Sequence, residues 1–403
     1  MLSVEQARQR ILTALRPTRT EVVSLAESWN RVNAAAVIAR LTQPPVDVSA
    51  MDGYALRAAD GGLGATLRVI GSAPAGHPFN GNVGPGETVR IFTGSVVPTG
   101  ADTILVQEDA TRDGNTVRVN EAVTSRRHIR RAGQDFAAGD TVIAAGRRMT
   151  ARDVGLAAAA NHPWISVHRR PRVAILATGD EIAMPGEPIP HGGIVSSNSH
   201  ALAALVRAAG AEPVVLPVAR DDVATIGATV DAALGMDLLV TTGGASVGDH
   251  DLVIESLRQH GMTLDFWRIA MRPGKPLLFG HLGQASVPVL GLPGNPVSAL
   301  VCGVLFVVPA ISRLSGLPAE LPATEPAILG AALAANDRRA DHLRATLTRG
   351  KQGQTIATPF EVQDSAMLLR LARADALILR APHAQAIPKG AEVTVIRLGA
   401  HGI

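Results

Sequence analysis

The sequence predicts a multidomain α/β protein built around a mostly parallel sheet that carries helices on both faces. At 403 residues the chain is too long for one hydrophobic core. Between residues 172 and 316, short runs of Val, Ile and Leu alternate with helical segments, which is the pattern of a doubly covered parallel sheet. The segments on either side carry short strand-like runs cut by Gly and Pro instead. We therefore expect a central three-layer αβα domain flanked by β-rich domains.

The amino-terminal part is predicted to be a helical linker domain. The capping box Ser3-Val4-Glu5-Gln6 opens an amphipathic helix that should run to about residue 15. Further helix is expected over residues 21–37, and helix resumes at Thr150. We assign residues 1–40 and 146–171 to this linker domain.

Residues 41–145 are predicted to form a β-rich domain inserted into the linker. Strand-like runs at residues 103–107 and 116–119 flank Asp113-Gly114-Asn115, which is a hairpin signal. After residue 321 the chain returns to β patterning up to its end at residue 403. We expect this last part to be a small carboxy-terminal β-barrel domain.

The central αβα domain is assigned to residues 172–320. Its expected strands cover residues 173–177, 214–218, 238–242, 264–270 and 287–290, and its expected helices cover residues 199–209, 222–234 and 251–260. An apolar helix follows Asn295. It is interrupted by Ser298, Gly303 and Pro309 and falls short of a bilayer span, so we expect it to be buried.

Composition excludes several classes of function. Aromatic residues are only 3% and the net charge is +3, which disfavours nucleic-acid binding. The first residues carry no signal-peptide pattern, so a cytoplasmic protein is expected. The single cysteine, Cys302, excludes a disulfide framework and a cysteine-ligated metal.

Four loops follow strands of the central domain and should meet at one edge of its sheet, where open α/β sheets bind ligands. Each alone is a common turn, but together they concentrate polar and flexible residues. The loops are Thr178-Gly179-Asp180-Glu181, Thr241-Thr242-Gly243-Gly244-Ala245-Ser246-Val247-Gly248-Asp249-His250-Asp251, Arg272-Pro273-Gly274-Lys275-Pro276 and Leu292-Pro293-Gly294-Asn295-Pro296.

The second loop combines the groups that a bound phosphate and a hard cation need. Gly243 and Gly244 allow backbone N–H groups to approach a ligand, and Ser246 adds a hydroxyl. Asp249 and Asp251 have oxygen ligands suited to Mg²⁺, although helix capping would also explain them.

Two further loops offer charged groups. Glu181 can supply another carboxylate. Lys275 and Arg272 place two positive charges on a short, stiff loop, which suits an oxyanion, with a solvated pair of cations as the alternative. Only three of the 38 basic residues are lysine, so a lysine inside this Gly/Pro loop is notable.

With these motifs, the sequence resembles the molybdopterin molybdenumtransferase family, which includes the bacterial MoeA proteins and the E domain of gephyrin. The resemblance covers nearly the whole chain. The matching segments are Ser49-Ala50-Met51-Asp52-Gly53-Tyr54-Ala55, Thr93-Gly94, Gly100-Ala101-Asp102-Thr103, Thr178-Gly179-Asp180-Glu181, Ser197-Asn198-Ser199, Thr242-Gly243-Gly244-Ala245-Ser246-Val247-Gly248-Asp249, Pro273-Gly274-Lys275-Pro276 and Gly291-Leu292-Pro293-Gly294-Asn295-Pro296-Val297-Ser298.

The resemblance implies an elongated, four-domain homodimer with a shared active site. It implies that the protein inserts molybdenum from molybdate into adenylylated molybdopterin and releases AMP with the assistance of Mg²⁺. It also implies that other molybdenum cofactor biosynthesis proteins are partners. By position, the residues that it assigns to catalysis are Asp52, Thr93, Asp135, Glu181, Asp251 and Lys275, those that bind the metal are Asp249 and Asp251, and those that bind the substrates are Gly243, Gly244, Ser246, Arg272, Pro276, Asn295, Arg344 and Ser365.

Within these sets the resemblance implies two further groupings. Arg272, Lys275, Arg344 and Ser365 would form the molybdate pocket. Asp52, Thr93 and Asp135 would approach from the partner subunit.

The chain departs from the family pattern at two places. Arg272 stands where the family usually has lysine, and Gln363-Asp364-Ser365-Ala366 lacks an expected glycine and serine while adding the charge of Asp364. Two alternative functions are compatible with parts of the sequence. A molybdopterin adenylyltransferase resembles the sheet domain alone, which the flanking β domains disfavour. A non-catalytic scaffold of the gephyrin E-domain type is disfavoured by the retained carboxylates of Glu181, Asp249 and Asp251.

Overall fold

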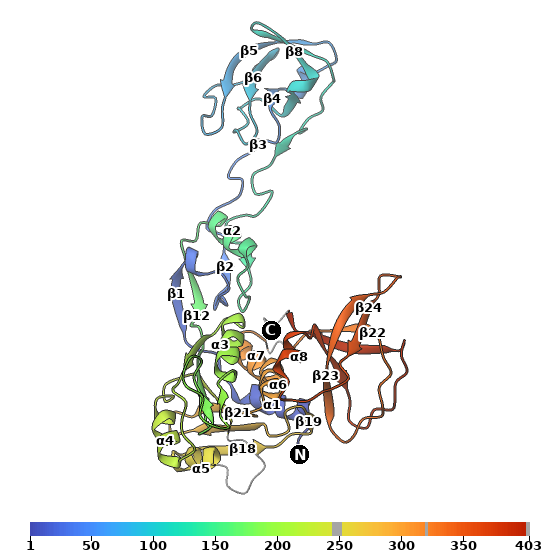
Figure 1. Ribbon diagram of the computed structural model, residues 1–403. Helices are drawn as coiled ribbons and strands as arrows, with labels where there is room; N and C mark the ends of the chain where they lie inside the picture. The colour runs from blue at the N-terminus through green and yellow to red at the C-terminus, as the bar shows by residue number, and fades with distance from the viewer. Residues whose placement is uncertain (244–251, 319–320, 400–403) are drawn as a thin grey trace.

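The computed structural model describes residues 1–243, 252–318 and 321–399 of the chain. Figure 1 shows an elongated molecule with a β-rich region at one end and a narrow linker in the middle. At the other end, the sheet domain and the carboxy-terminal barrel lie side by side.

The sheet domain contains the predicted three-layer arrangement. Its six strands lie in the order β16 (Glu212–Val215), β13 (Arg172–Ala177), β17 (Leu238–Thr242), β21 (Val287–Leu292), β20 (Leu278–Leu282) and β18 (Thr263–Trp267). The first four are parallel, whereas β20 runs antiparallel to both β21 and β18. Strand β17 has the predicted bounds, while β18 ends at Trp267 and β20 was not predicted.

Both faces of this sheet are buried because its strands are apolar at consecutive positions. Val173 and Ile175 of β13 belong to the core under helix α3 (Asn198–Ala208), while Ala174 and Leu176 belong to the core under α4 (Val223–Asp231) and α5 (Leu252–Gln259). Helix α3 therefore covers one face of the sheet, and α4 with α5 covers the other.

The apolar helix after Asn295 is a core element. It runs through α6 (Pro296–Cys302), the π-helical segment η4 (Gly303–Val307) and α7 (Val308–Leu314). Its length and composition would suit a membrane span, but 89% of its most apolar window is buried inside the protein. Helix α1 (Val4–Ala14), capped by Ser3 and Gln6 as predicted, packs Val4, Ala7 and Ile11 into the same core.

The helix expected over residues 21–37 was predicted wrongly. This segment instead forms strand β1 (Thr20–Ser24), the short helix η1 (Leu25–Glu27) and strand β2 (Val37–Ile38). Strand β1 pairs antiparallel with β12 (Trp164–His168). The β-branched Val22 and Val23 favour this strand conformation over a helix. Helix α2 (Ala151–Ala159) begins after the Thr150 cap, as predicted.

The β-rich region is an insertion whose two ends meet. The Ala39 N–H donates to the Asp140 carbonyl at 2.8 Å, and the Gly139 N–H donates to the Ala39 carbonyl at 2.9 Å. Beyond a short pair formed by β3 (Val48–Ser49) and β10 (Ile129–Arg130) lies a sheet of six strands. Its strand order is β7 (Thr103–Val106), β4 (Gly53–Leu56), β6 (Glu87–Ile91), β5 (Thr66–Ala73), β9 (Thr116–Val119) and β8 (Ala110–Asp113).

The hairpin around Gly114 is present, but one of its strands was misassigned. Strand β9 pairs with β8, whereas residues 103–106, the predicted partner, form β7 and pair with β4.

The carboxy-terminal region is a small closed barrel. Its strands are β22 (Thr324–Leu329), β23 (Ala340–Arg349), β24 (Thr355–Pro359), β25 (Ala376–Arg380) and β26 (Glu392–Arg397), and pairing of β23 with both β24 and β25 closes it. The short helix α8 (Leu368–Ala372) lies between β24 and β25. Strand β19 (Met271–Arg272) leaves the sheet domain and pairs with β23, so the two regions share a strand.

Candidate functional site

A cavity of about 970 Å³ opens at the carboxyl ends of β13, β17 and β21. All four loops that the sequence predicted to meet at one sheet edge contribute to its wall, through Thr178 and Glu181, Thr242 and Gly243, Lys275 and Pro276, and residues 293–296. Residues 194–198 and Asp221 also line it, as do Ala366 and Leu368 of the carboxy-terminal region.

The cavity lies at a switch point of the sheet, where the helices that follow two neighbouring strands cover opposite faces. Strand β13 leads to α3 on one face of the sheet, whereas the neighbouring β17 is followed by α5 on the other face. A point where successive helices cover opposite faces of the sheet is the usual ligand site of an open α/β sheet.

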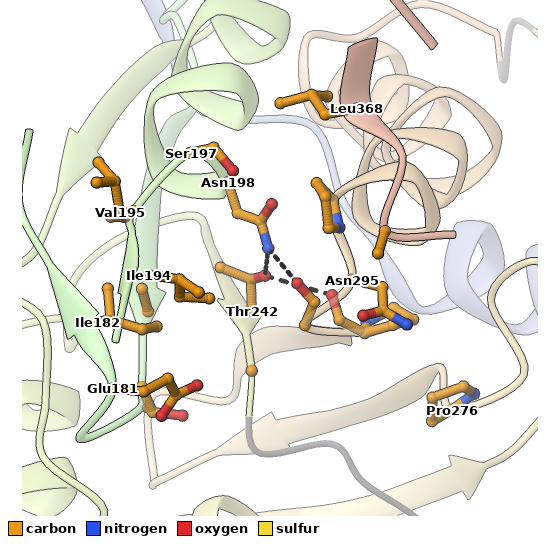
Figure 2. A pocket seen from close by; sticks show the side chains of 18 of the residues that line it. Glu181, Ile182, Ile194, Val195, Ser197, Asn198, Thr242, Pro276, Asn295 and Leu368 are labelled. Atoms are coloured by element: carbon orange, nitrogen blue, oxygen red, sulfur yellow. Dashed lines mark hydrogen bonds between the residues drawn. The ribbon is translucent and has the colours of Figure 1, made fainter. Parts of the chain in front are cut away.

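Close contacts between loops fix the floor of the cavity. Gly243 has φ +95°, and a Cβ atom there would lie 2.5 Å from the Thr178 carbonyl oxygen, so glycine is required. The Asn198 side chain donates to the Thr242 hydroxyl at 2.8 Å and to the Gly294 carbonyl at 2.7 Å, as Figure 2 shows. One amide thus ties the start of α3 to the ends of β17 and β21.

One part of the wall suits an anion. Lys275 is half-buried there, and within the described ranges it is the one lysine or arginine that lines the cavity. Its ammonium makes no hydrogen bond or ion pair with any residue that the structure describes. Asn295, also on the wall, donates to the Ser365 hydroxyl at 2.9 Å, which brings Ser365 next to the cavity.

Another part of the wall carries negative charge. Glu181 and Asp221 line it, and no salt bridge joins either to a basic residue in the described part of the chain. Desolvation by burial raises the pKa of Asp221 and repulsion from Glu181 and Asp180 adds to this, while a hydrogen bond from the Asp180 backbone offsets part of the effect. Two carboxylates that form no salt bridge with a described residue favour binding of a positive ion.

Asp221 was missed from the sequence. The signal was its place three residues after the predicted strand 214–218, in Asp221-Asp222. In the structure, Asp222 caps α4 by accepting from the Thr225 N–H at 2.8 Å. From the sequence alone, helix capping would account for either aspartate, so it did not point to a ligand site at Asp221.

Two predicted pocket residues, Arg272 and Arg344, do not line the cavity. Arg272 points to the carboxy-terminal barrel and pairs with Asp341 and Asp337. Arg344 is only 1% exposed and lies behind the wall segment, where Nη1 donates to the Met367 carbonyl at 3.4 Å and Nη2 has no partner among the described residues. Burial, followed by the charge of Arg370, lowers the pKa of Arg344.

The remaining predicted residues divide into two groups. Asp52, Thr93 and Asp135 lie in the β-rich region, remote from the cavity within one chain (Figure 1). There, the Asp52 carboxylate accepts from the Thr93 N–H at 2.7 Å and the Thr93 hydroxyl at 2.8 Å, and these bonds lower the pKa of Asp52. Gly244, Ser246, Asp249 and Asp251 lie outside the described residues.

The open α/β sheet with a cavity at its switch point, the inserted β-rich region and the terminal barrel define a multidomain α/β protein with a ligand site at the sheet edge, and comparison with known proteins identifies the family. The sequence matches the family profiles of the MoeA N-terminal region (domain I and II) over residues 2–161, a probable molybdopterin binding domain over residues 174–313, and the MoeA C-terminal region (domain IV) over residues 326–398.

Individual relatives agree with these profiles. Molybdopterin molybdenumtransferase 2 of Mycobacterium tuberculosis is 39% identical over 362 residues, which cover 86% of this chain and 88% of that protein. Molybdopterin molybdenumtransferase of Nostoc sp. is 38% identical over 305 residues, which cover 74% of this chain and 70% of that protein.

A solved structure shares the whole fold. The crystal structure of a molybdopterin biosynthesis MoeA protein from Pyrococcus horikoshii superposes with a TM-score of 0.84 at 27% identity, covering 98% of this chain and 100% of that one. The chain belongs to the molybdopterin molybdenumtransferase family, a family of transferases, which confirms the resemblance in its motifs.

Proposed function

We propose that this protein inserts molybdenum from molybdate into adenylylated molybdopterin and releases AMP with the help of Mg²⁺. The observation that carries the proposal is one cavity whose wall combines a lysine and two carboxylates, none of which forms a salt bridge with a residue that the structure describes. An anionic, phosphate-bearing substrate together with a hard cation would complement both groups.

The lysine is suited to the oxyanion substrate. Molybdate is a dianion, and charge-assisted hydrogen bonds from fixed donors are the strong way to bind it. Lys275 supplies the positive charge, and Ser365 and Asn295 supply hydroxyl and amide groups beside it. The buried Nη2 of Arg344, which has no partner among the described residues, gives this end further positive potential from behind the wall.

The carboxylates fit a magnesium ion by their chemistry. Mg²⁺ prefers carboxylate and phosphate oxygens, and Glu181 and Asp221 offer the former without a competing salt bridge in the described ranges. When bound, Mg²⁺ neutralises charge on the phosphoanhydride that is cleaved. Asp249 and Asp251 remain the ligands predicted from the sequence, and Glu181 can supply another carboxylate. In this proposal these residues hold the phosphate end of the substrate while Gly243 lets it approach the backbone.

The proposal includes a homodimer in the cytoplasm. Asp52, Thr93 and Asp135 carry functional groups but lie far from the cavity of their own chain. A second subunit would bring them to it. This arrangement is supported by the Asp52–Thr93 pair, in which two hydrogen bonds from Thr93 orient the Asp52 carboxylate on the β-rich region.

The test is reconstitution with defined substrates. Purified protein is incubated with adenylylated molybdopterin, molybdate and Mg²⁺, and both AMP and active cofactor are assayed. We expect both products to depend on all three additions. Formation of adenylylated molybdopterin from ATP and molybdopterin, without molybdenum insertion, would instead identify an adenylyltransferase.

A further inference from the structure

The loop that carries Lys275 is attached to the barrel by an arginine. The Arg272 Nε donates to the Asp341 Oδ1 at 2.7 Å, and its Nη2 bonds to the other oxygen of the same carboxylate. Weaker contacts follow from Nη1 to Asp337 at 3.4 Å and from Nη2 to Asn336 at 3.3 Å. All three guanidinium nitrogens of Arg272 are therefore occupied by the barrel.

The backbone of the loop is held as firmly as the side chain. Arg272 belongs to β19, which pairs with Ala340 and Asp341 of β23, and the Ala340 N–H donates to the Ala270 carbonyl at 2.9 Å. The loop then closes on itself, because the Ile269 N–H donates to the Lys275 carbonyl at 2.9 Å.

The opposite side of the loop packs on helix α6. Gly274 has φ +113°, and a Cβ atom there would lie 2.5 Å from the Cys302 Sγ. The backbone that carries Lys275 is therefore fixed on one side by the barrel and on the other by the core of the sheet domain.

A guanidinium in this position is not available to bind an anion. The Asp341 side chain is only 6% exposed, so moving Arg272 toward the cavity would leave a buried carboxylate without its partner. Breaking such a pair is strongly unfavourable. The two-pronged geometry with Asp341 is also one that arginine forms and lysine cannot.

We infer that Arg272 and Asp341 form a clasp that positions the Lys275 loop against the barrel, and that Arg272 is not an oxyanion ligand in this protein. This inference rests on the proposed function and revises the part that sequence resemblance gives to Arg272. The barrel thereby acts on the oxyanion subsite through Asp341, a residue that does not line the cavity.

The two roles of Arg272 predict opposite results for Asp341→Asn. If Arg272 bound molybdate, loss of the competing carboxylate would leave molybdate binding unchanged or stronger. If the pair is a clasp, Asp341→Asn weakens molybdate binding by about tenfold to a hundredfold, because displaced catalytic groups lose effectiveness on that scale. Molybdate binding is measured calorimetrically on the full-length protein, alongside the molybdate dependence of the reaction.

Exchange of the two charges provides the rescue experiment. Arg272→Asp alone should reduce molybdate binding, and Arg272→Asp combined with Asp341→Arg should restore a large part of it, since the ion pair is rebuilt in reverse. A direct ligand at position 272 would not be rescued by this exchange. Hydrogen exchange over residues 269–277 should rise in each single variant and fall again in the double variant.

Controls separate the clasp from folding and from the proposed function. Glu325→Gln breaks the exposed Arg397–Glu325 pair in the same barrel and should leave molybdate binding unchanged. If Asp341→Asn does not fold, the exposed outer partner is tested by Asp337→Asn, which should give a smaller loss in the same direction. If the wild-type protein binds no molybdate, the proposed function is overturned. If the wild-type protein binds molybdate and Asp341→Asn binds it equally well or more tightly, the clasp alone is overturned.

Discussion

The cavity in the sheet domain and the Asp52–Thr93 pair in the β-rich region are built in different ways. The cavity draws on residues from 177 to 368, which tertiary hydrogen bonds such as those of Asn198 bring together. The pair is formed within one small sheet, by the start of β4 and the loop after β6. The cavity has walls and charges of both signs, whereas the pair presents one oriented carboxylate. The comparison fits the proposed shared site, in which the cavity binds the ligands and the β-rich region of a second subunit supplies a carboxylate.

Subunit complementation tests this comparison with the largest expected effect. Asp52→Ala and Glu181→Ala should each lower turnover by about a hundredfold or more if each carboxylate acts in catalysis. When the two inactive variants are mixed and allowed to exchange subunits, half of the dimers should be mixed and should have one of two sites intact. Activity should therefore return to about a quarter of the wild-type value.

The control for complementation is a mixture of Asp52→Ala with itself, carried through the same exchange. Exchange is verified with two affinity tags. Mixed dimers that form and remain inactive would show that Asp52 and Glu181 serve sites within one chain.

Removing the positive charge of the cavity should have a smaller effect. Lys275→Gln keeps a side chain of similar length, and a lost charge-assisted contact is worth roughly 1.5–3 kcal/mol. The molybdate concentration for half activity should rise about ten- to a hundredfold. Affinity for adenylylated molybdopterin, measured without molybdate, should barely change.

Lys351→Gln is the matched control, because Lys351 is an exposed lysine in the turn between β23 and β24. Its molybdate dependence should equal that of the wild type. Loss of pterin affinity in Lys275→Gln, with unchanged molybdate dependence, would place Lys275 on the substrate phosphate instead.

The smallest effect is expected at the Asp52–Thr93 pair. The pKa of Asp52 is lowered first by the Thr93 N–H and second by the Thr93 hydroxyl, with a minor contribution from Arg90. Thr93→Val removes the hydroxyl and keeps the N–H, so the pKa of Asp52 should rise part of the way back. Carboxyl NMR titration measures the shift directly.

The sign of the accompanying pH dependence follows from this lowered pKa. The stabilisation that ionised Asp52 gives is present above its ordinary pKa and is lost as pH falls through its lower folded value. In Thr93→Val this loss should begin at a higher pH than in the wild type. An unchanged Asp52 titration would show that the hydroxyl contributes nothing and that the backbone N–H alone holds the carboxylate.

The parts of the fold that depend on local pattern were predictable. Strand β17 and the capped start of α1 follow from a run of apolar residues and from a capping box within four residues. Strand β1 was misread as helix because its partner, β12, lies about 140 residues further along the chain. Local periodicity cannot reveal a pairing at that distance.

The same limit applies to the site. The four loops were placed at one sheet edge because the carboxyl ends of parallel strands share an edge. The sequence could not show that Arg272 would be taken up by Asp341, 69 residues later. It also could not separate Asp221, on the cavity wall, from Asp222, which caps a helix.

The meeting of Ala39 and Asp140 at the base of the β-rich region has a consequence for protein engineering. Because the chain departs and returns at two residues joined by a hydrogen bond, the whole region is a side branch that a short turn can replace. A branch-deleted protein should keep the pairing of β1 with β12 and the cavity, giving a reagent for studying ligand binding by the cavity alone. The same junction would accept the equivalent region of a relative, so chimeras can exchange the β-rich region while the cavity stays fixed.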